Sequence, residues 1–91
     1  MSKSKMFVKV GQFLRVKREA KKISQTEVAE ALKVKPQFVS NWERGMSSPP
    51  LRLMKPLMKM YGIPEQQMLN LLVAEHESFL RQELGLRKKR G

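Results

Sequence analysis

Proline and glycine divide this chain into short segments, and within these segments apolar residues recur at spacings that are typical of helices. Before the final residue, the two residue types stand only at positions 11, 36, 45, 49–50, 56, 62, 64 and 85. No segment alternates polar and apolar residues for long enough to indicate a half-buried strand. Segment 65–84 has no such interruption and can form one extended helix. The sequence therefore predicts an all-α fold of about five helices, with an extended helix near its C-terminal end.

Length and residue usage exclude several kinds of protein. The 91 residues are enough for one small domain but not for two separate cores. There is no cysteine and one histidine, so disulfides, thiol chemistry and zinc clusters are excluded, and we expect His76 at an interface or on the surface. The longest apolar run, 71–74, is too short to cross a membrane. We expect no cofactor, no metal, no membrane association and, without an apolar secretory segment, a cytoplasmic location.

The charged residues are unevenly placed along the chain. Lys and Arg number 19 against eight acids, all of them Glu, which gives a net charge of +11. Residues 1–62 hold 14 of the cations and four Glu, whereas 65–84 hold one Arg and four Glu. A basic body favours a polyanionic partner, nucleic acid before an acidic membrane, and an ordinary basic protein is the alternative. The basic tail, 85–91, is expected to be disordered and to add non-specific attraction to phosphate.

The first predicted helix, at about residues 5–22, carries an arginine on its apolar side. Phe7, Val10, Leu14 and Arg18 recur at spacings of three and four, which places them on one face of a helix. A guanidinium that is buried needs a carboxylate partner, because an unpaired charge is costly to remove from water. The pattern therefore predicts that Arg18, if buried, has an acidic partner elsewhere in the chain.

Two short helices joined by a tight link follow. Ser24 and Glu27 form the capping-box pattern that begins a helix, here at about 24–32. Pro36 is tolerated in the first turn of a helix and begins the next one, at about 36–44, which Gly45 ends. The link between the two helices is three residues long, and this arrangement is a helix-turn-helix.

The second helix of this pair has an apolar side and a polar side. Val39 and Trp42 point to the core, and we place Phe38 with them, contact with a thymine methyl group being the alternative. The opposite side holds Gln37, Ser40, Asn41 and Arg44. A polar helix face can pair with base edges in the major groove of DNA. The N-terminus of the preceding helix offers backbone N–H groups to a phosphate.

A further helix is expected at about 50–61, although Pro56 lies inside it. An interior proline costs about 3 kcal/mol or kinks the helix. We therefore expect a kink at this position or a late helix start near Lys55. Methionines are adaptable fillers of cores, and we expect that role for most of Met46, Met54, Met58, Met60 and Met68.

Taken together, these residues resemble the lambda-repressor-like (Xre/Cro) helix-turn-helix family. The resemblance rests on Ser24-Gln25, Val28-Ala29, Leu32 and Val34, then on Val39-Ser40, Trp42-Glu43-Arg44-Gly45 and Pro49. Gly11, Leu14-Arg15 and Arg18 upstream and Tyr61-Gly62-Ile63 downstream also agree, so it covers about residues 10–70. The combination is specific, whereas any single piece would be weak. It implies a lambda-repressor-like bundle, with a DNA-binding domain at about 5–70 and double-stranded DNA as the partner.

The resemblance also implies roles for individual residues. Base-reading positions fall on Lys35, Pro36, Gln37 and Asn41, and phosphate-contacting positions on Ser24, Gln25, Ser40, Arg44, Ser47 and Ser48. It pairs Arg18 with Glu43 in a structural ion pair. Pro36 has no hydrogen-bonding group for a base, so direct readout is left to Lys35, Gln37 and Asn41. Lys33 stands where the family often has glycine, which costs about 1 kcal/mol if the backbone there is left-handed.

The C-terminal helix, expected at 64–84, carries a broad apolar stripe. A lambda-type domain needs only the first part of this helix for its own core, and exposed apolar stripes usually mark an interface. We expect the helix to form a homodimer or to bind a partner protein, and folding back onto the body is the alternative. The expected interface residues are Leu72, Val73, His76, Phe79, Leu80 and Leu84.

These observations predict a sequence-specific DNA-binding transcriptional regulator. Its simplest mechanism is repression by operator occupancy as a homodimer. One alternative is the antitoxin of a toxin–antitoxin pair, which would hold its toxin through the C-terminal helix. Another is a protein-bridging coactivator that uses the same fold. We do not expect an enzyme, because the sequence offers no metal cluster, nucleophile–base pair or phosphate loop.

Overall fold

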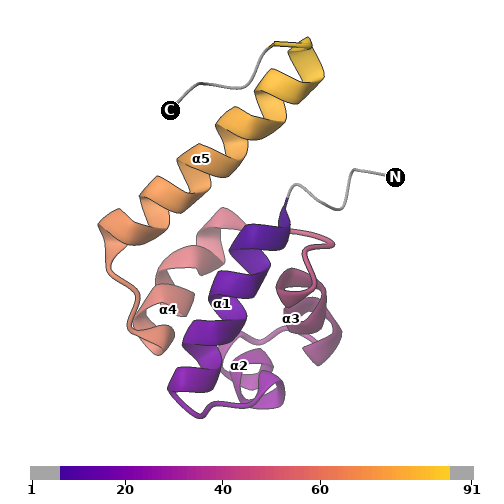
Figure 1. Ribbon diagram of the computed structural model, residues 1–91. Coiled ribbons are helices and arrows are strands. Elements are labelled where there is room, and N and C mark those ends of the chain that lie inside the picture. The colour runs from indigo at the N-terminus through magenta and orange to yellow at the C-terminus, as the bar shows by residue number, and fades with distance from the viewer. Residues whose placement is uncertain (1–6, 87–91) are drawn as a thin grey trace.

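Five helices follow one another along residues 7–86, the part of the chain that this computed structural model describes (Figure 1). No strand occurs among these residues, so the all-α prediction is confirmed. The expected basic tail lies outside the described residues from position 87 onward. The helices are α1 (Val8–Ala20), α2 (Gln25–Leu32), α3 (Pro36–Glu43), α4 (Leu51–Tyr61) and α5 (Glu65–Leu84).

The start of α2 is fixed by local hydrogen bonds. The backbone N–H of Glu27 donates to Ser24 Oγ at 3.0 Å, and the backbone N–H of Ser24 donates to Glu27 Oε1 at 2.7 Å. This is the reciprocal capping box that the sequence predicts. The helix ends at Lys33, whose φ of 60° is left-handed. The short link to α3 therefore begins with a conformation that favours glycine over lysine.

Helix α4 begins at Leu51 and runs continuously through Pro56, so the expected late start near Lys55 is wrong. The residues on either side of the proline are anchored in the core: Leu53 is 7% exposed and Leu57 is fully buried. Burial of such side chains contributes about 1.5–3 kcal/mol each, which offsets the cost of an interior proline. Pro56 itself is exposed, so its ring occupies the solvent side of the helix.

The core is built around α1, which packs against α3, α4 and α5, while α2 packs against α3. Met54 and Met68 are buried, and Met58 and Met60 pack against the core as partly buried side chains. Met46, by contrast, is 57% exposed in the loop after α3, so the core role expected for most of these methionines is confirmed for the other four. The innermost side chains are Val10, Leu14, Val28, Val39, Leu57 and Met68.

Two glycines allow α1 to lie close to the end of α3. A Cβ atom on Gly11 would collide with the carbonyl oxygens of Trp42 and Glu43. Gly45 adopts a φ of +78° just after α3, and a Cβ there would lie 2.8 Å from the Cα atom of Val8. Any other residue at either position would push α1 away from α3. These glycines therefore fix where the end of α3 sits against the body of the protein.

Helix α5 packs on the body through its first half, and its second half extends beyond the other four helices (Figure 1). One side faces inward, where Met68 is 2% exposed and Leu71 and Leu72 pack against the core. Phe79, also partly buried, lines a cavity with Lys9 of α1. No described helix is long and apolar enough to cross a membrane.

Candidate nucleic-acid interface

Helix α3 is presented at the surface by the way its first turn is built. Lys35 precedes the helix in an extended conformation, and Pro36 occupies the first helical position. Its fixed φ suits that position, and the missing N–H would have no partner inside the helix. Lys35, Pro36 and Gln37 are all exposed. The beginning of α3 therefore projects a cation, a ring and an amide away from the core.

A row of polar side chains continues along the outer face of α3. Gln37 Nε2 donates to Asn41 Oδ1 at 3.3 Å, and Arg44 Nη2 donates to the same oxygen at 2.6 Å. The carbonyl oxygen of Asn41 is thus engaged by two donors, while its own amide N–H groups are left for another acceptor. Gln37 and Arg44 are exposed, and Asn41 is partly buried between them. Together the row offers both donors and acceptors at the helix surface.

Behind this face, a buried carboxylate joins three helices. Glu43 on α3 accepts from Arg18 Nε at 2.6 Å and from Arg18 Nη2 at 3.1 Å, and it accepts from Gln25 Nε2 at 2.9 Å. Arg18 also donates to the backbone oxygen of Ile23 at 2.7 Å. Arg18 and Glu43 are 9% and 8% exposed, and their hydrogen bond raises the pKa of Arg18. Burial and the negative charge of Glu43 raise the pKa of Tyr61.

A comparison with protein families identifies this arrangement. The family model described as helix-turn-helix, that of the Xre and lambda-repressor-like proteins, matches residues 14–68. The chain belongs to this family. Searches among curated proteins and among solved structures gave no match. The matched region runs from α1 into the first turn of α5 and includes both helices of the motif. The molecule is thus a DNA-binding helix-turn-helix regulator with the lambda-repressor-like all-α fold, and the family is generally non-enzymatic.

Within this helix-turn-helix protein, the candidate phosphate contacts lie around α3 rather than only on it. Ser24 is exposed at the start of α2, and Ser40 and Arg44 lie on α3 and at its end. Ser47 and Ser48 are partly buried in the following loop, where the hydroxyl of Ser48 donates to the backbone oxygen of Pro49 at 3.5 Å. All of these positions remain candidates, and the structure places them on α2, α3 and the adjoining loop.

Gln25 has a structural partner that sequence reasoning missed. Its amide donates to Glu43, so this side chain links α2 to α3 inside the motif. The capping box of Ser24 uses the N–H of Glu27, the third residue of α2. The backbone N–H groups of Gln25 and Thr26 precede it in the first turn, where helices leave such groups free for an anion. These backbone donors are therefore available to an anion at this end of α2, whereas the amide of Gln25 is bonded to Glu43.

Phe38 is not in the core of this helix-turn-helix protein, which corrects our expectation. Its side chain is 49% exposed, whereas Val39 and Trp42 are 1% and 4% exposed. Adjacent helical positions point about 100° apart, and the inward side of α3 is already filled by Val39, Trp42 and Glu43. The sequence predicts Phe38 in the core beside Val39 and Trp42. Phe38 instead lies at the border between the buried side and the polar row.

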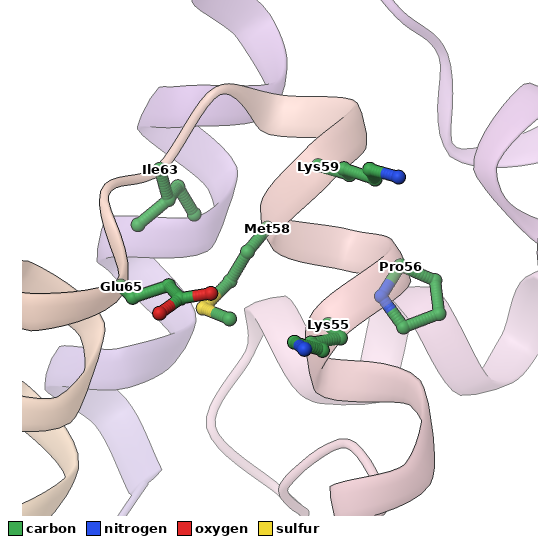
Figure 2. A pocket seen from close by; sticks show the side chains of 6 residues that line it. All are labelled: Lys55, Pro56, Met58, Lys59, Ile63 and Glu65. Atoms are coloured by element: carbon green, nitrogen blue, oxygen red, sulfur yellow. The ribbon is translucent and has the colours of Figure 1, made fainter.

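A separate cavity of about 510 Å³ lies along α4 (Figure 2). Its lining comes from α4, from the link after it and from the start of α5, so it is distinct from the polar row on α3. No group of acids and histidines that suits a metal occurs there or elsewhere in the described part of the chain. The lining residues, all labelled in Figure 2, are Lys55, Pro56, Met58, Lys59, Ile63 and Glu65.

Proposed function

We propose that this protein is a transcriptional repressor that occupies a specific operator as a homodimer. The observation that carries the proposal is the polar row of Gln37, Asn41 and Arg44 on the outer face of α3. Those side chains expose the donors and acceptors that adenine and guanine edges require in the major groove. They do so on a chain with a net charge of +11, which attracts the phosphate backbone.

In the proposed complex, the start of α3 enters the major groove. Gln37 and Asn41 read bases by hydrogen bonding, and their mutual hydrogen bond exchanges for bonds to the base edges. Lys35 contacts a base or a phosphate at the entrance, and Pro36 touches the groove without hydrogen bonding. Phosphates are held on either side of the groove, which fixes the register of the protein on DNA. These contacts are assigned to Ser24, Gln25, Ser40, Arg44, Ser47 and Ser48.

The homodimer forms through the outer side of α5. Four exposed apolar residues and His76 follow one another there at spacings of four, three, four and four, as in the seam between two packed helices. Two of the expected interface residues are partly buried: Leu72 packs against the core, and Phe79 lines a cavity with Lys9 of α1. A two-fold dimer would hold two α3 helices about 34 Å apart, one DNA turn. The outer stripe consists of Leu69, Val73, His76, Leu80 and Leu84.

Selection from random duplexes tests sequence-specific binding. The wild-type protein should enrich one motif with two similar half-sites. Gln37→Ala should then lose about 1–3 kcal/mol of binding free energy on the best site and relax its preference at one base pair per half-site. Gln67→Ala is the matched control, because Gln67 is exposed on α5 and far along the chain from the motif. Fluorescence anisotropy at fixed salt concentration measures each affinity.

Two results would contradict the proposal. If the wild-type protein enriches no motif and binds all duplexes alike, with an affinity that falls steeply with salt, it is not an operator-binding repressor. If Gln37→Ala selects the same motif as the wild type, Gln37 does not read a base. A second small protein that co-purifies and binds the outer stripe of α5 would instead favour the antitoxin or the bridging coactivator.

A further inference from the structure

Phe38 exposes a large apolar ring beside the polar row on α3. Among residues 25–43, all of which the structure describes, it is the large hydrophobic side chain with the greatest exposure, at 49%. The other large apolar residues of α3 are almost fully buried. The core does not account for this position, because α3 already fills its inward side with Val39, Trp42 and Glu43.

The ring lies beside the residues that are proposed to read bases. Positions three apart on a helix are neighbours on its surface, so Phe38 is flanked by Lys35 on one side and Asn41 on the other. Its backbone N–H donates to the oxygen of Lys35 at 2.9 Å, which places it in the first turn of α3. Side chains on a helix tilt toward its N-terminus. The ring therefore extends toward the end of α3 that meets base edges in a helix-turn-helix complex.

A phenyl ring has no hydrogen-bond donor or acceptor, which limits what it recognises in the major groove. The apolar group that DNA presents there is the C5-methyl group of thymine. We infer that Phe38 is a specificity-determining residue that packs on a thymine methyl group, next to the base pair read by Asn41. This inference rests on the proposed function, because it needs α3 in the major groove of a selected site. It predicts a required thymine that no hydrogen bond from the protein explains.

Replacement of single thymines by deoxyuridine tests this contact, because it removes the methyl group and leaves base pairing intact. Burying one such group is worth about 0.8 kcal/mol, so the wild-type protein should bind about fourfold more weakly when the critical thymine of a half-site is replaced. Phe38→Ala should bind the thymine duplex at least fourfold more weakly than wild type. It should also bind the thymine and deoxyuridine duplexes equally.

Two further variants serve as controls for the Phe38→Ala result. Phe38→Leu retains an apolar side chain and should keep part of the sensitivity to the methyl group. Val16→Ala removes a side chain that is 62% exposed on α1, and it should leave both affinities unchanged. Since Phe38 and Val16 are both exposed, circular dichroism and thermal midpoints of their variants should match the wild type.

Three results would overturn the inference, and each differs from failure of the proposed function. If no deoxyuridine substitution weakens wild-type binding to a selected site, no thymine methyl group is contacted. If Phe38→Ala keeps the full methyl effect, another group such as Pro36 makes the contact. If Phe38→Ala binds as tightly as wild type, the ring serves something other than DNA. Failure of the proposed function would instead leave the wild type without any selected site.

Discussion

Glu43 is the residue on which α1, α2 and α3 converge. Its carboxylate is 8% exposed and accepts from Arg18 and from Gln25, which lie on two other helices. A buried charge is tolerated when each of its oxygens has a partner, and the described residues contain no buried side-chain nitrogen or oxygen atom without one. Removal of either partner leaves the other charge uncompensated in the core. This one side chain therefore ties α3 to both α1 and α2.

Glu43→Ala should lower the free energy of unfolding by about 3 kcal/mol, because it leaves the Arg18 guanidinium buried without its carboxylate. Chemical denaturation followed by circular dichroism measures the change. Glu30→Ala is the control, because Glu30 is exposed on α2 and should shift stability by less than about 0.5 kcal/mol. Equal midpoints for wild type and Glu43→Ala would show that the ion pair does not stabilise the fold.

At the scale of the elements, the turn between α2 and α3 is the least favourable piece of local structure in the motif. Lys33 holds a φ of 60° there. For a residue with a Cβ atom, this conformation is about 1 kcal/mol less favourable in free energy than for glycine. The turn nevertheless closes, because Val28, Val39 and Trp42 are buried on both sides of it. Lysine also adds positive charge beside the end of α3 that is proposed to enter DNA.

Lys33→Gly should raise the free energy of unfolding by about 1 kcal/mol, because glycine adopts the left-handed conformation without strain. Lys33→Ala is the matched variant, because it also removes the charge but keeps the Cβ atom. Both variants should weaken DNA binding to the same extent if the charge of Lys33 contacts phosphate. Thermal and chemical unfolding measure the stability of both variants. If Lys33→Gly is no more stable than Lys33→Ala, the backbone at Lys33 is not strained.

At the scale of the whole molecule, the basic body and the last helix differ in charge. Segment 1–62 is strongly basic, whereas 65–84 has four Glu and one Arg and is a poor ligand for DNA. The same helix exposes large apolar side chains, with Val73 at 56%, Leu80 at 42% and Leu84 at 68%. This difference in charge suits the basic body, but not α5, to DNA. Two copies joined through α5 would keep their acidic segments away from the phosphates.

Leu80→Glu should convert the proposed dimer into a monomer, because it places a charge in the middle of the apolar seam. Sedimentation at micromolar concentration measures the mass of the variant in solution. Its affinity for DNA with two half-sites should fall, whereas its affinity for a single half-site should not. Ala74→Glu is the control, because Ala74 is exposed on α5 outside the stripe and lines the cavity beside Lys9. A wild-type protein that sediments as a monomer would refute the dimer.

Local rules account for most of the helix boundaries. The capping box at Ser24, Pro36 at the start of α3 and Gly45 after its end act through neighbouring residues, so the sequence alone places α2 and α3 to within one residue. The late start expected for α4 is wrong, because packing against the rest of the core decides this boundary and local rules do not. The intrinsic cost of Pro56 led us to expect a kink or a late start near Lys55, but α4 begins at Leu51 because burial of Leu53 and Leu57 outweighs that cost. That burial depends on α1 and the rest of the core, which no local pattern describes.

The sequence by itself determined the helix-turn-helix, its family and the charge that suits it to DNA. Caps, helix periodicity and net charge are properties of nearby residues or of simple sums, so they can be read without a fold. Only the tertiary structure decided that Phe38 faces solvent, that Gln25 binds Glu43, and that α5 turns Leu72 inward but Val73 outward. Each of these depends on which helix lies opposite, and burial is set by that long-range packing.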